Sequence, residues 1–486
     1  MRVLRDGLCK ADLFASLVVF LVALPLCVGV AMASGVPAEL GLVTGIVGGL
    51  VAGLLPGRSL QVSGPSAGLT VLVYEAVHRY GVGALGVLVF GAGLVQLVLG
   101  LLRLGRWFRA VSVAVVQGML AGIGLVLVAG QVYALGDATA PGGGLAKLSG
   151  LVSLPALLDP VALSVGGATV AVLLLWPRWE RGARLVPAPL VAVGVAAAVT
   201  GVFGLDVRRV EVRGLLDAVR LPEAADVGRL TEVGVLGTVV AFALIASAES
   251  LFGAAAVDRL PDGRRTDYDR ELIAQGAGNA VCGVLGALPM TAVIVRSAAG
   301  GTPSGRVQAG ARAKASRVLH GVWLLVFTVV VPGVLGVIPV AALAALLVHA
   351  GCRLVPVREV RVLWRGHRGE VVVLVVTATA IVVGNLFEGV LVGLALAVAK
   401  TAWDVSHVHV ETEDRGEAGL VVRVLGHATF LRLPKLLDAL EALPRDREVR
   451  LELGGLRHLD HACAAALEGW AAGRGQALRA TNSFTS

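Results

Sequence analysis

The stretch "GALPMTAVIVRSAAGG", residues 286–301, interrupts an otherwise apolar region with a proline, a threonine, an arginine and paired glycines. The pattern predicts an extended arm from Gly286 to Leu288, a break at Pro289, and a short helix that begins at Met290 or Thr291. Irregular backbone within an apolar region is typical of the broken helices that line the binding sites of membrane transporters.

The composition of the whole chain supports a membrane protein. Its 486 residues are 56% hydrophobic and 16% charged, and the mean hydropathy is +0.82. A helix needs about 20 apolar residues to cross ~30 Å of hydrocarbon, and the chain supplies many such stretches. The net charge of +8 comes from arginines that lie between apolar stretches. They form no basic, aromatic-studded surface, so nucleic-acid binding is not expected.

Fourteen apolar spans are predicted, which gives an all-α polytopic membrane protein. The first apolar run is too long for a typical signal peptide and is interpreted as a retained span. Basic loops follow every second span, which predicts cytoplasmic N- and C-termini and a multi-pass protein of the cytoplasmic (inner) membrane. The predicted spans are 13–33, 40–56, 62–77, 81–102, 110–135, 158–176, 185–204, 233–257, 271–287, 288–299, 318–336, 337–352, 370–386 and 388–404.

The composition changes after residue 405, where the transporter domain (1–405) is predicted to end. Residues 406–417 are polar and predict a linker, and residues 476–486 predict an unstructured tail. Between them, residues 418–475 alternate strand-like and helical patterns, as in "LVVRVLGHATF" followed by "LPKLLDALEAL". We expect a small cytoplasmic α/β domain there.

No catalytic or metal-binding pattern is found. The five cysteines are scattered without CxxC or Cys/His ligand spacing, so neither disulfides nor structural zinc is expected. His458 and His461 flank Asp460, but an ordinary solvated turn explains them better than a metal site. A nucleophile triad, a P-loop and a dinucleotide loop are all missing from the sequence, so we expect neither an enzyme nor a cofactor.

A second interruption resembles the first. In "LQVSGPSAGLTVLVY", residues 60–74, an extended arm from Gln61 to Ser63 is followed by a break at Gly64 and Pro65 and a short helix from Ser66. Each interruption is the third span of a seven-span half. Because seven is odd, the halves would have opposite orientations in the membrane, which is typical of an inverted-repeat transporter.

The chemistry of two facing helix starts favours an anion as the substrate. A helix N-terminus exposes unpaired N–H groups and carries about +0.5 of an elementary charge. Arg296 follows the second break, and an arginine at the bilayer centre costs on the order of 3 kcal/mol unless it faces a polar partner or cavity. The alternative is that the prolines and glycines of both interruptions only kink closely packed membrane helices. Separately, glycine spacings such as Gly118 to Gly122 predict close helix packing and give no information about the substrate.

Glu249, in "VVAFALIASAESLFGAAAV", is the other charged residue that is energetically costly to place inside a membrane span. We interpret it as a proton or sodium site, or as a counter-charge to Arg296. A structural salt bridge, or a helix-end acid that reaches the interface, is the alternative.

These segments resemble the SulP anion transporters, whose animal relatives include prestin and pendrin. The similar segments are "DLFASLVVFLVALPLCVGVAMASGVP", "VSGPSAGLTVLV", and the long run from "SAESLFG" through "LPMTAVIVRSAAGG". The tail resembles an abridged STAS domain. The resemblance implies two seven-span inverted repeats, a core (13–102 and 233–336) that moves like an elevator against a gate (110–204 and 337–404), and a homodimer.

The resemblance also implies site residues. The anion would lie between two helix starts and beside a basic residue, and the eighth-span acid would take part in cation coupling. The implied substrate-binding residues are Ser66, Ala67, Gly68, Thr291, Ala292, Val293 and Arg296, and the coupling-ion residue is Glu249. Three features depart from the family: Leu26 follows Pro25 where some proton-coupled members have a glutamate, the connection after Arg296 is longer than usual, and the STAS domain is abridged.

The sequence thus predicts a secondary transporter of a small inorganic anion, with sulfate and bicarbonate as the leading substrates, driven by H⁺ or Na⁺ symport. A chloride/bicarbonate-type exchanger, in which Glu249 only balances Arg296, is the alternative within transport. A related nucleobase carrier would need more polar groups than Ala292 and Val293 provide. An anion sensor or scaffold that does not transport is the alternative from another class.

Overall fold

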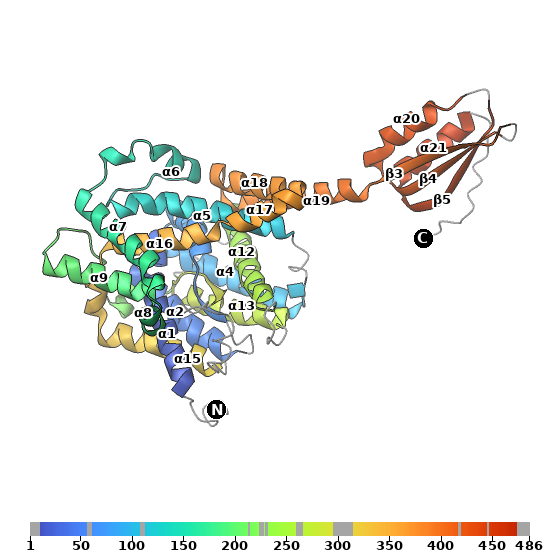
Figure 1. The fold of residues 1–486 in the computed structure, drawn as a ribbon. Helices are drawn as coiled ribbons and strands as arrows, with labels where there is room; N and C mark the ends of the chain where they lie inside the picture. The colour runs from blue at the N-terminus through green and yellow to red at the C-terminus, as the bar shows by residue number, and fades with distance from the viewer. Residues whose placement is uncertain are drawn as a thin grey trace. The chain divides into compact units, whose positions relative to one another are not determined.

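The computed structural model describes residues 10–55, 61–106, 112–211, 214–222, 228, 232–258, 266–294, 314–416, 419–444 and 447–473 (Figure 1). The chain divides into two compact units, Met1–Gly393 and Leu394–Ser486. Each is described by itself.

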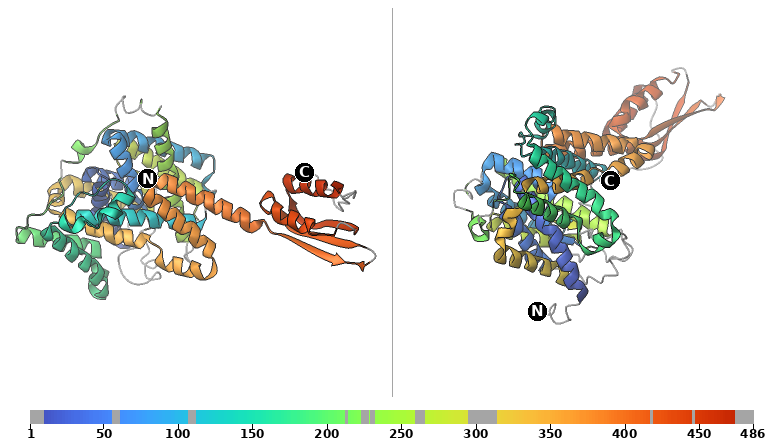
Figure 2. Two further views of the ribbon diagram at one scale, coloured as in Figure 1. Left: turned by 90° about the horizontal axis from the view of Figure 1, so that it is seen from above. Right: turned by 60° about the vertical axis from the view of Figure 1, so that its left-hand side comes forward.

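The first unit is mostly helical (Figure 1 and Figure 2). A helix lies at each predicted span except the tenth, whose described part contains the strand Met290–Ile294 and whose residues 295–299 lie outside the described residues. The longer helices of this unit are α1 (Lys10–Ala33), α2 (Ala38–Val47), α3 (Thr70–Tyr80), α4 (Val82–Leu101), α5 (Val113–Leu135), α7 (Pro160–Leu175), α9 (Ala188–Val202), α12 (Val233–Asp258), α13 (Tyr268–Val284), α15 (Lys314–Val330), α16 (Val340–Leu354), α17 (Val357–Gly366), α18 (Arg368–Val383) and α19 (Leu386–Val405), the last of which continues into the second unit. Within the described residues, seven helices are long and apolar enough to cross a membrane.

Short elements connect these helices. They are the π-helix η2 (Gly48–Ala52), the 3₁₀ helices η3 (Ala67–Leu69), η5 (Leu154–Ala156), η6 (Trp176–Arg178) and η8 (Pro332–Val337), and the helices α6 (Gly144–Gly150), α8 (Glu180–Leu185) and α10 (Leu215–Ala218). A two-stranded antiparallel sheet, β1 (Gln61–Pro65) with β2 (Met290–Ile294), joins two parts of the chain that are far apart in sequence.

The helix contacts of the first unit occur in matching pairs. Helix α4 packs against α12 and α13, and α15 packs in the same way against α1 and α2. Strand β1 contacts α1 and α2, while β2 contacts α12 and α13. Likewise α5 packs against α18, and α16 packs against α7. Two copies of one arrangement related by a pseudo-two-fold axis would produce this pairing.

Small residues let the helices approach closely. A Cβ added to Gly118 of α5 would lie 2.7 Å from Thr377 Cβ, and one added to Gly122 would lie 2.9 Å from Ile381 Cβ. The close packing predicted from the spacing of these glycines is therefore present between α5 and α18.

The second unit ends in a three-stranded sheet of order β3-β4-β5, with α20 (Leu433–Glu441) and α21 (His461–Gly473) packed against it (Figure 1). Strand β4 (Leu420–Ala428) pairs antiparallel with β3 (Val408–Asp414) and parallel with β5 (Val449–Leu459). The core contains fully buried residues such as Val422, Leu436 and Cys463.

The prediction of a linker at residues 406–417 is wrong, because this stretch contains strand β3. Its polar composition conceals a period of two: Val408 faces the core and Val410 packs against it, while Glu411 and Glu413 are exposed. Glu413 then pairs with Arg423 of β4. A strand at a sheet edge can be polar on its outer face and still contribute to the core.

Candidate functional site

The two interrupted segments meet in the structure. Strands β1 and β2 pair antiparallel, with Ser63 opposite Ala292 and Gly64 opposite Thr291. Pairing satisfies part of their backbone polar groups, and side chains of α12 and α13 bond to others in β2, which is how non-helical backbone can exist at membrane depth. The prediction that the first segment is extended over Gln61 to Ser63 is confirmed, and its strand continues through Pro65.

The first break opens a helix as predicted. Ser66 has an extended backbone and its Oγ accepts a hydrogen bond from the N–H of Gly68 at 3.0 Å, as an N-cap serine does. The 3₁₀ turn of Ala67 and Gly68 follows, and then helix α3 begins at Thr70. Proline before the cap keeps the preceding chain extended, so the sequence "GPSAG" explains the position of the helix start.

Glu249 of α12 lies against this helix start. The hydroxyl of Ser66 donates a hydrogen bond to Glu249 Oε1 at 2.5 Å. A Cβ added to Gly68 would lie 2.4 Å from the same oxygen, so a side chain at this position would have to displace the carboxylate. Glu249 Oε2 is buried and has no hydrogen-bond partner among the described residues.

The residue after Glu249 contacts the other interrupted segment. Ser250 Oγ accepts a hydrogen bond from the N–H of Ala292 at 3.1 Å. Thr291 is fully buried, and its Oγ1 has no hydrogen-bond partner within the described residues. Helix α12 therefore contacts both the helix start at Ser66 and strand β2. Three predicted parts of the site, Glu249 and the two interrupted segments, lie together.

The prediction of a helix from Met290 or Thr291 is wrong. Thr291, Ala292 and Val293 lie in strand β2, so within the described residues they are not at a helix start. The run "MTAVI" is rich in β-branched residues, which favour strands, and β1 offers a backbone edge for pairing. A local sequence pattern does not reveal that edge, because β1 is more than two hundred residues away.

The arm before β2 is also different from its prediction. Gly286 is not extended but has a φ of 66°, and it ends helix α13. The N–H of Gly286 bonds to the carbonyl of Gly283 at 3.1 Å, and that of Ala287 bonds to the carbonyl of Cys282 at 2.8 Å. This is a Schellman ending, which requires a left-handed residue and therefore favours glycine. Arg296 lies outside the described residues, which resume at Lys314.

A chain of buried amides, which was not predicted from the sequence, holds β2 in place. Asn279 of α13 clamps Met290: its Oδ1 accepts from the Met290 N–H at 2.7 Å, and its Nδ2 donates to the Met290 carbonyl at 3.1 Å. Asn279 Nδ2 also donates to Gln96 Oε1 at 2.7 Å, and Gln96 Nε2 donates to Ser247 Oγ at 3.1 Å. Asn279, Gln96 and Ser247 are all essentially buried.

A second buried amide positions β1. Gln275, one turn before Asn279 on α13, donates from Nε2 to Ser63 Oγ at 2.8 Å and to Glu271 Oε1 at 2.9 Å. Gln275 and Asn279 are four residues apart and so lie on one helix face. The sequence could have indicated this network, because two amide side chains four residues apart in an apolar span are rarely buried without polar partners.

Comparisons with known proteins agree with this arrangement. The model of the sulfate permease family matches residues 9–377. The chain belongs to the sulfate permease family. It is 26% identical over 398 residues to YvdB of Bacillus subtilis (strain 168), which is named as a sulfate transporter, covering 80% of this chain and 72% of that protein. It is 28% identical over 359 residues to the bicarbonate transporter BicA of Synechocystis, covering 70% of this chain and 60% of that one.

Solved structures share the fold. The transmembrane domain of a cyanobacterial BicA aligns with a TM-score of 0.65 at 24% identity, covering 80% of this chain and 97% of that one. Murine Slc26a9 in an inward-facing state aligns with a TM-score of 0.78 at 15% identity, covering 97% of this chain and 85% of that one. The chain is therefore a multi-pass membrane protein of an anion-transporter family, and its relatives are transporters rather than enzymes.

Proposed function

We propose that this chain is a secondary active transporter of a small inorganic anion, sulfate or bicarbonate, that couples uptake to H⁺ or Na⁺. The observation that carries the proposal is the contact of Glu249 with Ser66, at the place where the two interrupted segments meet. YvdB is named for sulfate and BicA for bicarbonate, and both are similar to this chain.

The anion is proposed to bind at the start of α3, with Ser66, Ala67 and Gly68 on one side and Thr291, Ala292 and Val293 of β2 on the other. The start of a helix favours an anion through its N–H groups and dipole. Arg296, two residues beyond β2 in the sequence, is proposed to add positive charge. The buried Thr291 hydroxyl without a partner is a donor that an anion could accept from.

Glu249 is proposed to be the coupling residue. A carboxylate with one hydrogen-bonded oxygen and one buried oxygen without a partner is stabilised by a proton or by a cation. Because Glu249 is beside the proposed anion site, its negatively charged carboxylate would repel an anion. A carboxylate neutralised by a proton or a bound cation would allow the anion to bind. This mutual dependence is the requirement for symport.

The topology of the proposal is two inverted repeats of seven spans, with both termini in the cytoplasm of a bacterial-type inner membrane. The matching helix contacts and the antiparallel pairing of β1 with β2 support it. Residues 13–102 and 233–336 would form the moving core, and residues 110–204 and 337–404 the gate. The C-terminal α/β unit would be an abridged STAS-like domain, and the transporter a homodimer.

Transport in proteoliposomes tests the proposal. We expect labelled sulfate or bicarbonate to accumulate against its gradient when a proton or sodium gradient is imposed, and Arg296→Ala to weaken uptake. Exchange without any gradient-driven accumulation would favour the exchanger, and binding without flux would favour a sensor. Full transport by Arg296→Ala would remove that residue from the site.

A further inference from the structure

Helix α17 exposes large apolar side chains between two spans. It contains ten residues, "VREVRVLWRG", and connects α16 to α18, with Val355 and Pro356 before it and His367 after it. None of its residues is buried. Val357 is 60% exposed, Val362 72% and Trp364 57%. A helix tied so closely to a span at each end stays near the boundary of the membrane.

Most residues of α17 separate into two sides, with Val362 as an exception beside the arginines. At 100° per residue, Val357, Val360, Leu363 and Trp364 fall within one apolar sector. Arg358, Arg361 and Arg365 fall together in a neighbouring sector. Helix α17 contacts α18, and Val360 and Leu363 are half-buried, whereas Val357 and Trp364 remain exposed. The apolar side is therefore only partly covered by the protein.

Helix α17 has a positive net charge, and its arginine side chains are available to bind an anionic partner. Three arginines and one acid, Glu359, give the helix a net charge of +2. Arg358, Arg361 and Arg365 are exposed, and they make no ion pair among the residues that the structure describes. An exposed apolar side beside arginines that make no ion pair with the described residues is complementary to a membrane surface, where anionic headgroups lie next to apolar acyl chains.

A tryptophan beside arginines recurs at another helix end. Trp179 follows η6, the 3₁₀ turn after α7, and is 58% exposed, between Arg178 and Arg181 in the sequence. In the proposed topology, the ends of α7 and α16 face the same side of the membrane. Tryptophan is enriched at the level of the lipid headgroups, and arginine there contacts phosphates.

We propose that α17 lies in the headgroup layer of the membrane and binds anionic phospholipid headgroups through Arg358, Arg361 and Arg365. Val357 and Trp364 insert toward the acyl chains. An amphipathic helix with a strongly basic side binds a membrane in this way. The proposal rests on the proposed topology, but it does not depend on which anion is transported.

Lipid retention by the purified full-length protein tests this proposal. Native mass spectrometry would count the molecules of phosphatidylglycerol and phosphatidylcholine that remain bound after equal exposure to both. We expect wild type to prefer phosphatidylglycerol, and the triple variant Arg358→Gln, Arg361→Gln, Arg365→Gln to lose on the order of tenfold or more of that preference. The single variant Arg361→Gln is expected to lose about fivefold, which serves if the triple variant is unstable.

Two matched variants on the same helix sharpen the result. Glu359→Gln removes the acid and is expected to increase the preference for phosphatidylglycerol. Trp364→Ala is expected to reduce the retention of both lipids without changing the preference. An unchanged preference in the triple variant, or equal retention of both lipids by wild type, would overturn the proposal. Neither readout requires transport, so a failure of the proposed transport function would be seen separately, as loss of anion uptake.

Discussion

Ser66 and Glu249 are joined by a hydrogen bond of 2.5 Å although they are 183 residues apart in the sequence. Ser66 uses the same oxygen to accept from the N–H of Gly68, so the cap of the short helix is also the partner of the carboxylate. A change in the charge of Glu249 therefore acts directly on the start of the helix that is proposed to bind the anion.

The first prediction concerns coupling. Glu249→Gln keeps an acceptor for the Ser66 hydroxyl but can neither release a proton nor hold a cation as a charged ligand. We expect gradient-driven accumulation of the anion to be lost, while exchange of anion across the membrane continues. Glu388→Gln is the matched control, because Glu388 is an exposed acid at the start of α19. If both variants accumulate the anion as wild type does, Glu249 is not the coupling residue.

The second prediction uses two glycines of one segment. A Cβ at Gly68 would meet Glu249 Oε1 at 2.4 Å, whereas a Cβ at Gly64 would meet nothing within 4 Å. Overpacking of this kind costs about 1–3 kcal/mol. We expect Gly68→Ala to raise the KM for anion uptake by about tenfold or more, and Gly64→Ala to change it by less than about twofold. Similar effects from both variants would show that the crowding at Glu249 is unimportant.

The sequence predicted the elements that depend on local pattern. Apolar length located the helices, and "GPSAG" located the start at Ser66, because both follow from residues that are neighbours in the chain. Glu249 was identified because an acid within an apolar span is energetically costly, and Ser66 because serine after a Gly-Pro break is a typical helix start. Their contact could not be predicted, because Arg296 was the more obvious partner for an acid.

Elements that depend on distant partners were predicted incorrectly or not at all. Strand β2 exists where a helix was predicted because β1 supplies its edge and Asn279 clamps Met290. The interactions that decide β2 join segments far apart in the sequence. Strand β3 exists where a linker was predicted because it pairs with β4, the next strand along the chain, and the polar composition of residues 406–417 concealed that hairpin.

The third prediction tests the amide clamp on β2. Asn279→Ala leaves the buried N–H and carbonyl of Met290 without partners, and an unpaired buried polar group costs about 1–3 kcal/mol. We expect a lower midpoint of thermal unfolding and, in the fraction that folds, weaker anion uptake. An ionised Asn279→Asp keeps the acceptor for the Met290 N–H but loses the two amide donors to the Met290 carbonyl and to Gln96. If the bond to the Met290 N–H is the important one, the loss of thermal stability and of uptake in Asn279→Asp should lie between wild type and Asn279→Ala.

Gln96→Leu separates positioning from stability in this network. It removes the acceptor of Asn279 Nδ2 but leaves both bonds to Met290 intact. We expect KM to remain within about threefold of wild type although the protein is destabilised by about 1 kcal/mol. If Gln96→Leu and Asn279→Ala weaken uptake equally, the clamp on Met290 is not what positions β2.

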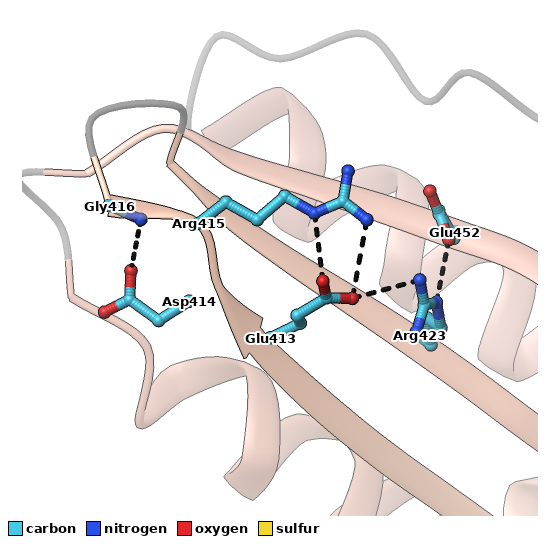
Figure 3. Close-up of polar contacts among 6 residues, drawn as sticks. All are labelled: Glu413, Asp414, Arg415, Gly416, Arg423 and Glu452. Atoms are coloured by element: carbon cyan, nitrogen blue, oxygen red, sulfur yellow. Dashed lines mark hydrogen bonds and ion pairs between the residues drawn. The ribbon is translucent and has the colours of Figure 1, made fainter.

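The fourth prediction concerns acid sensitivity of the C-terminal unit. Glu413 of β3 pairs with Arg415 at 3.2 Å and with Arg423 of β4 at 3.0 Å, and Arg423 also pairs with Glu452 of β5 at 3.0 Å (Figure 3). The hydrogen bond and charge of Arg415, and then those of Arg423, hold the pKa of Glu413 below its usual 4.5. A lowered carboxyl pKa stabilises the fold above the unfolded pKa, and this contribution is lost as the pH falls through the folded pKa.

Hydrogen exchange of β3 in the full-length protein measures this effect. We expect protection of residues 408–414 to fall as the pH drops below about 4.5, after correction for the intrinsic exchange rate. Arg423→Gln should make exchange roughly two- to fivefold faster at neutral pH and reduce its dependence on pH. Arg450→Gln, an exposed change on β5 that breaks none of these ion pairs, is the control. If Arg450→Gln and Arg423→Gln have the same pH profile, the acid sensitivity comes from the overall charge of the unit and not from the pairing of Glu413 across the sheet.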